Sequence, residues 1–180
     1  MPFKRIPRHY DEQALYEYAI GALGRRMRTV AELKRLMRPR VLDQPNGELL
    51  IDVVIARLKE QRYLNDASYA AAYSSIRKDN EKFGKLRVVR DLKTKGMHPE
   101  VIQRAVNSAY EGVNEEALAR AFLARKRISR PTNQKQAARI FRALVRAGFT
   151  ARVIIPILKK WNVEDETLSA LEQEQEEAGS

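Results

Sequence analysis

The sequence contains no cysteine and only two histidines, His9 and His98. Without cysteine the chain can form neither a disulfide framework nor a thiolate metal site. Two histidines are too few for the usual histidine-based metal sites. We therefore expect no metal and no cofactor.

Recognisable catalytic motifs are also missing. There is no phosphate-binding loop of the G-x-x-x-x-G-K type, no H-E-x-x-H and no nucleophile placed beside a base. Carboxylates are the remaining acids and bases, and none of them form an obvious pair. The sequence predicts a binding protein with no catalytic residues rather than an enzyme.

Long apolar runs are absent. The longest span about six residues, as in Val153–Leu158, whereas a membrane-spanning helix needs about 20. The first ten residues are basic but lack the apolar core of a secretory signal. We expect a cytoplasmic protein that does not contact the membrane.

Glycine and proline are scarce, with eight and seven copies, and they separate stretches whose apolar residues have helical spacing. No stretch shows the sustained alternation of a half-buried strand. The sequence therefore predicts an all-α fold.

A repeat is visible at a shift of 52 residues. Leu92, Gly96, Val101 and Ile102 recur as Leu144, Gly148, Val153 and Ile154, and Arg87 and Arg90 recur as Arg139 and Arg142. Both glycines are expected just after a helix, where left-handed dihedrals suit glycine. Helix, tight turn, helix is the geometry of a helix-turn-helix.

The pattern predicts three tandem three-helix repeats. Units of about 50 residues have little core of their own and stack in series. The expected divisions are a basic arm over 1–10, repeats over 11–64, 65–112 and 113–161, and an acidic tail over 162–180. The expected helix starts include Asp11, Thr29, Asn65, Pro99, Asn114, Thr132 or Asn133, and Thr150.

Aromatic residues make up only 7% of the chain. Tyr63, Tyr69, Tyr73 and Phe122 have core-like spacing. We interpret them as packing residues rather than as platforms on which bases stack.

Charge is distributed unevenly. The formal net charge is +11, and a balance this basic favours a polyanionic partner such as nucleic acid. No acid lies between Ala117 and Val163, a segment that holds twelve Lys or Arg residues. The last 19 residues carry seven acids and no base, so the rest of the chain has a formal charge of +18.

The basic segment contains a stripe at helical spacing. Lys135, Arg139, Arg142 and Arg146 are four, three and four residues apart, which places them on one helical face. With no acid nearby in the sequence, an anion on a partner would balance them. A solvated face is the alternative, although such faces usually alternate in sign. The other candidate contacts are Lys85, Arg87, Arg90, Lys95, Lys126 and Arg127.

These residues resemble the bacterial regulatory protein RecX family, whose members modulate the RecA recombinase. Four segments carry the resemblance over about residues 11–161: Arg26-Met-Arg28-Thr29-Val-Ala-Glu32-Leu33-Lys-Arg-Leu36; Tyr63-Leu64-Asn65-Asp66; Lys82-Phe83-Gly84 followed by Arg87, Arg90, Leu92, Lys95 and Gly96; and Leu144-Val-Arg146-Ala-Gly148-Phe149. Arg62 stands where the family usually has glycine, and the acidic tail is outside the motif set.

The resemblance implies that the repeats form an elongated, curved array. It also implies a monomer that binds along the groove of the RecA filament on single-stranded DNA. It also implies restraint of ATP hydrolysis, strand exchange and coprotease activity in DNA repair and the SOS response. Contacts to single-stranded DNA itself would be weaker and independent of sequence.

Two other functions remain open from the residues. A helix-turn-helix transcription factor would need polar side chains that read base edges, and the stripe is almost purely cationic. A protein-interaction solenoid would use its charge only for solubility. The acidic tail either folds back on the third repeat and competes with DNA, or is a disordered solubilising segment.

Overall fold

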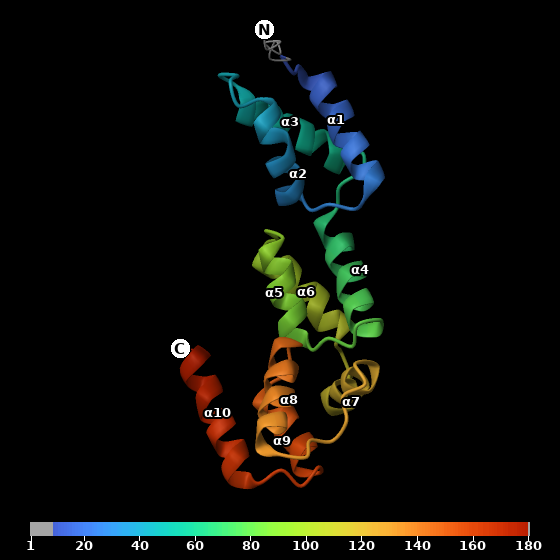
Figure 1. Cartoon of the computed structure of the whole chain (residues 1–180). Coiled ribbons are helices and arrows are strands. Elements are labelled where there is room, and N and C mark those ends of the chain that lie inside the picture. The colour runs from blue at the N-terminus through green and yellow to red at the C-terminus, as the bar shows by residue number, and fades with distance from the viewer. Residues whose placement is uncertain (1–8, 180) are drawn as a thin grey trace. The chain divides into compact units, whose positions relative to one another are not determined.

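The computed structural model describes residues 9–179, with the side chains of residues 176, 178 and 179 left aside. Within that range the chain forms helices and no strand, as the all-α prediction requires. Figure 1 follows the elements in order. They are α1 (Glu12–Arg25), α2 (Val30–Met37), the 3₁₀ helix η1 (Arg38–Arg40), α3 (Gly47–Glu60), α4 (Asp66–Asp79), α5 (Lys85–Thr94), α6 (Pro99–Ala109), α7 (Glu115–Arg125), α8 (Gln134–Arg146), α9 (Ala151–Lys159) and α10 (Asp165–Gly179).

Local capping chemistry sets several helix starts where the sequence predicts them. The Asp11 carboxylate accepts a hydrogen bond from the Ala14 amide at 2.7 Å, which satisfies an amide that lacks a partner within α1. Asn133, and not Thr132, caps α8. Thr150 occupies the cap position of α9 without a side-chain hydrogen bond. Most of the basic arm expected over 1–10 lies outside the described residues.

The contacts between residues divide the chain into two compact units. Unit 1 comprises Met1–Ala70 and Leu92–Ile102, and unit 2 comprises Ala71–Asp91 and Gln103–Ser180. The boundary passes through α4, α5 and α6. The expected second repeat therefore contributes residues to both units.

The core of unit 1 lies among α1, α2 and α3. Leu15, Leu33, Ile51 and Leu58 are completely buried there. Their periodic spacing on three short helices gives each helix one apolar stripe, and burial of these stripes stabilises the unit.

Unit 1 also contains the first of two close contacts that we call joints. In each joint, the turn inside a helix-turn-helix contacts the start of another helix. Thr29 caps α2, and its hydroxyl donates a hydrogen bond to the Lys95 carbonyl at 2.8 Å. The Lys95 ammonium lies 3.1 Å from the Glu32 carboxylate. Gly96 has φ +74°, and a Cβ there would lie 2.6 Å from the Ala31 methyl group. The turn after α5 is thus fastened to the start of α2.

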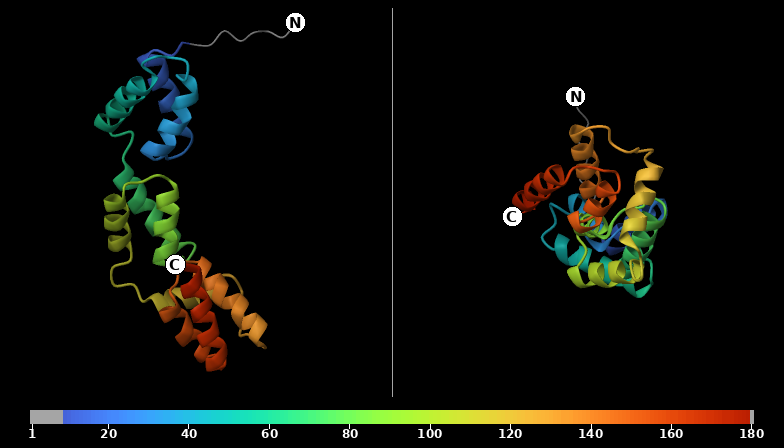
Figure 2. Two further views of the ribbon diagram at one scale, coloured as in Figure 1. Left: turned by 90° about the vertical axis from the view of Figure 1, so that its left-hand side faces the viewer. Right: turned by 90° about the horizontal axis from the view of Figure 1, so that it is seen from below.

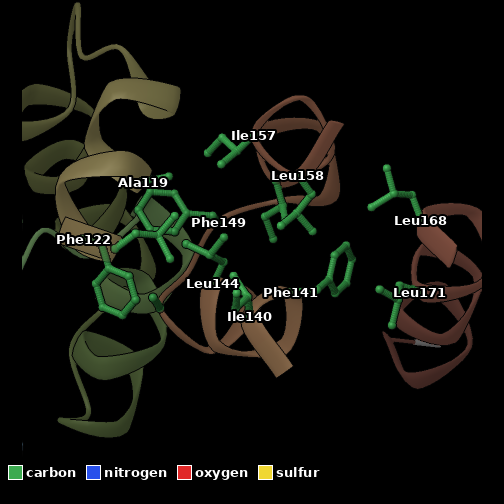
Figure 3. Close-up of a cluster of buried hydrophobic side chains, with 13 residues drawn as sticks. Ala119, Phe122, Ile140, Phe141, Leu144, Phe149, Ile157, Leu158, Leu168 and Leu171 are labelled. Carbon is green, nitrogen blue, oxygen red and sulfur yellow. The ribbon is translucent and has the colours of Figure 1, made fainter. Parts of the chain in front are cut away.

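The core of unit 2 lies among α7, α8, α9 and α10. Ala119, Phe122, Leu144, Phe149 and Leu158 are buried together (Figure 3). The acidic segment is not a loose tail: it forms α10, which packs against α8 and α9 (Figure 2). Leu168 and Leu171 attach α10 to this core.

The second joint lies within unit 2. The Gly84 amide donates to the Ala147 carbonyl at 2.8 Å, and the Leu86 amide donates to the Gly148 carbonyl at 3.3 Å. A Cβ on Gly84 would overlap the Gly148 carbonyl, and a Cβ on Gly148, where φ is +96°, would overlap the Arg87 amide. The start of α5 and the turn after α8 can approach this closely because both residues are glycine.

We expect Gly148→Ala to destabilise unit 2 more than Gly112→Ala does. Gly112 also has positive φ (+66°) but has open space around it, so its substitution costs the left-handed penalty of about 1–2 kcal/mol alone. Alanine at 148 adds a clash with Arg87. Urea unfolding of both variants measures the difference, and equal losses would show that the joint does not require close approach.

The stability of unit 1 is expected to depend on the ionisation of Glu32. Burial alone would raise the pKa of Glu32, but the Thr29 amide and Lys95 outweigh it and hold the pKa below its ordinary value of 4.5. A lowered pKa stabilises the fold above the unfolded value, and that contribution disappears as the pH falls through the folded value. The gap in free energy of unfolding between wild type and Glu32→Gln should therefore be largest at neutral pH and narrow below about 4.5. A gap that stays constant between pH 7 and pH 3 would contradict this.

Candidate nucleic-acid interface

The predicted basic stripe lies on the solvent side of α8. Lys135, Arg139, Arg142 and Arg146 are all exposed, and the opposite side of the helix buries Ala137, Ile140, Phe141 and Leu144 in the unit 2 core. The amphipathic pattern thus turns the cations outward, because the buried apolar side fixes the rotation of the helix.

The structure corrects one expectation about this stripe. Arg142 is not without a nearby acid, because its guanidinium lies 3.0 Å from the carboxylate of Glu174 on α10. Lys135, Arg139 and Arg146 have no ion pair with any residue in the described range. Three of the four cations therefore carry charge that nothing described in the chain balances.

A groove adjoins the stripe and brings predicted residues together from three helices. It has a volume of about 340 Å³ and is lined by Arg87 at the start of α5, by Lys126 after α7, and by Arg146 at the end of α8. Its remaining lining residues are Phe83, Phe122, Ile128, Ala143 and Ala147. Apolar walls with cations around them can hold a phosphate and the flat part of a nucleotide beside it.

Arg87 is held in place within this groove. Its guanidinium contacts the Asp91 carboxylate at 2.9 Å, donates to the Arg146 carbonyl at 3.3 Å and lies 5.4 Å from the centre of the Phe83 ring. Asp91 balances most of the Arg87 charge. The free positive charge of the groove therefore comes from Lys126 and Arg146, which form no ion pair with a described residue.

Phe83 is the groove residue that sequence reasoning missed. Its ring is partly exposed, packs 6.2 Å from the Phe122 ring and lies within 6 Å of both the Arg77 and Arg87 guanidinium carbons. Its position between Lys82 and Gly84 in the second repeat was a usable signal. Phe122 is buried, as expected, but Tyr63 is 59% exposed, so its interpretation as a packing residue was wrong.

The other predicted residues are not gathered at this groove. The Lys85 ammonium donates to the Asn107 side chain at 2.7 Å, Arg90 is exposed on α5, and Arg127 follows α7 with φ +54°. Lys95 belongs to unit 1, where Glu32 balances its charge and the Tyr69 ring lies 5.4 Å from its ammonium. Lys95 thus has a partner within the fold.

Neither a metal site nor a membrane span is found in the described part of the chain. No group of three or more His, Asp or Glu side chains between residues 9 and 179 could hold a metal ion. None of the described helices combines the length and the apolar character needed to cross a bilayer.

The sequence of the chain is similar to those of several known proteins. A family model described as "RecX, second three-helix domain" matches residues 65–106. The chain is 32% identical over 163 residues to "Regulatory protein RecX" of Deinococcus radiodurans, covering 88% of this chain and 74% of the relative. It is 29% identical over 140 residues to the protein of that name in Bacillus subtilis, covering 77% and 52%.

A further relative, "Regulatory protein RecX" of Halalkalibacterium halodurans, is 26% identical over 174 residues, which cover 93% of this chain and 64% of the relative. The chain thus spans between about half and three quarters of the length of these relatives. Among solved structures, RecX from Lactobacillus salivarius superposes with a TM-score of 0.66 at 21% identity, covering 84% of this chain and 96% of that one. A second, "Crystal structure of regulatory protein RecX", gives 0.67 at 18% identity, with 83% and 71% covered. These likenesses show the fold of three-helix repeats.

The cations of the groove allow a prediction of how the salt concentration affects the affinity of the protein for single-stranded DNA. Each phosphate contact contributes about −0.7 to the slope of log K against log salt concentration for single strands. We expect Arg146→Gln to reduce the magnitude of that slope by about 0.7 on an oligothymidylate. Arg152→Gln removes an exposed cation of α9 outside the groove and the stripe, and should leave the slope unchanged. Equal slopes for both variants would remove Arg146 from the interface.

Proposed function

The chain belongs to the RecX family of regulatory proteins, and we propose that it binds the RecA filament on single-stranded DNA and restrains RecA. In this proposal the protein acts as a cytoplasmic monomer. It lies along the filament groove and lowers ATP hydrolysis, strand exchange and coprotease activity in DNA repair and the SOS response. A protein that regulates RecA in this way need not catalyse a reaction, and the sequence contains none of the catalytic motifs considered above.

The proposal rests on one observation. The exposed cations of the α8 stripe and the cationic groove adjoin each other on unit 2. Arg139 and Arg146 expose unbalanced charge on α8, and Lys126 adds another cation at the groove. Contacts from such cations to phosphates give affinity without sequence information. A filament that presents a continuous DNA backbone offers this kind of ligand.

The structure gives less support to the alternative of a sequence-specific transcription factor. Besides the Arg and Lys that read guanine, a protein that reads a mixed sequence needs free amide side chains, such as those of Asn and Gln, to read adenine. On α8, the Gln134 side chain donates to Glu164 at 3.0 Å, and the Gln136 side chain accepts from the Thr132 amide at 2.9 Å. Both amides are already engaged, which leaves mainly cations on the exposed side.

The Arg139→Glu/Arg146→Glu double variant replaces two unbalanced cations with acids. We expect the concentration of this variant that inhibits RecA to be at least about tenfold higher than that of wild type, which corresponds to about 1.4 kcal/mol. Titration into RecA ATPase and strand-exchange reactions on single-stranded DNA measures this. The Arg104→Glu/Arg152→Glu variant changes net charge equally at exposed positions of α6 and α9 and should inhibit like wild type.

Full inhibition by a folded Arg139→Glu/Arg146→Glu protein would remove the stripe from the RecA contact. A wild-type protein that leaves RecA unaffected and strongly prefers one duplex sequence would favour the transcription-factor alternative.

A further inference from the structure

The helix α10 is rich in acids and packs beside α8. The sequence from Glu164 to Glu177 holds seven acids and no base. Leu168 and Leu171 are 2% and 5% exposed, and Figure 3 shows Phe141 pointing from α8 toward them. These leucines anchor α10 beside α8.

One of these acids binds a residue of the predicted interface directly. The Glu174 carboxylate lies 3.0 Å from the Arg142 guanidinium, with both side chains more than half exposed. The same two residues line a second groove together with Phe141, Val145, Arg146, Leu171 and Gln175. Arg146 therefore lines both grooves, the one that contains Glu174 and the cationic one.

The contact between α10 and α8 is suited to exchange. An exposed ion pair is weak and is screened by salt, so a polyanion of higher charge density can replace the carboxylate. The Gln175 side-chain oxygen is buried without a hydrogen-bond partner among the described residues. The C-terminal half of α10 thus contacts α8 through an exposed ion pair, whereas the two leucines anchor its N-terminal half.

We propose that α10 is an internal competitor for the basic side of α8. The Glu174 carboxylate occupies Arg142 in the free protein, and a nucleic-acid phosphate must displace it to bind there. The mechanism rests on the proposed function, because it regulates the same surface. It lowers affinity for free single-stranded DNA and favours ligands with a high local phosphate density.

The sharpest test compares two substitutions that remove one negative charge from the same helix. Glu174→Gln breaks the contact with Arg142, whereas Glu166→Gln neutralises an exposed acid in the first turn of α10. Both keep the anchoring leucines and the full chain. Fluorescence anisotropy with a labelled oligothymidylate at low salt should show about two- to fivefold tighter binding for Glu174→Gln. Glu166→Gln should change affinity by less than about 1.5-fold.

A second comparison isolates the ion pair. In an Arg142→Gln background the cation that Glu174 masks is gone, so Glu174→Gln and Glu166→Gln should have equal effects. Equal tightening in the wild-type background would show that α10 acts only through net charge, and no tightening would show no competition; either result overturns the proposal. A wild-type protein that binds no single-stranded DNA and does not affect RecA would instead contradict the proposed function.

Discussion

The fold depends on a close approach that occurs twice, once within each unit. In each joint the turn of a helix-turn-helix meets the start of an earlier helix. Lys95 meets Thr29 and Gly96 meets Ala31 in unit 1, and Ala147 and Gly148 meet Gly84 in unit 2. In both joints a main-chain carbonyl in the turn accepts a hydrogen bond at the helix start. A glycine with positive φ in each turn leaves room for the Ala31 methyl group in unit 1 and for the backbone of Gly84 and Arg87 in unit 2. Arrays of small repeats need such joints, because one repeat buries too little apolar surface to be stable alone.

Features set by neighbours in the sequence were predictable. The cap at Asp11, the starts of α2 and α7, the proline at the start of α6 and the left-handed Gly148 all follow from interactions within a few residues. The outward direction of the α8 stripe was predictable for the same reason, since the helical period and the apolar residues together fix the orientation of a helix.

Features set by distant residues were not predictable. Arg87 and Arg146 are 59 positions apart and meet only because the second joint seats α5 on the turn after α8. Periodicity says which side of α5 is apolar, but it does not say which helix covers that side. The Arg142–Glu174 contact has the same character, with 32 positions between its members. The acidic composition of the last segment left open whether it folds back on the third repeat, and did not indicate that Leu168 and Leu171 would anchor it beside α8.

The two joints also explain why cations of similar spacing have different roles. Arg87 and Lys95 lie at joints, where Asp91 and Glu32 balance them, so their charge serves the packing of repeats. Arg139 is the repeat counterpart of Arg87, but it lies on α8, whose start is not covered by a further turn in the described chain. Arg139 is therefore exposed and forms no ion pair with a described residue. In the proposed function, contact with a polyanion therefore falls on arginines of the third repeat that no described joint uses. In the proposed mechanism, α10 acts on Arg142, a cation that neither joint uses.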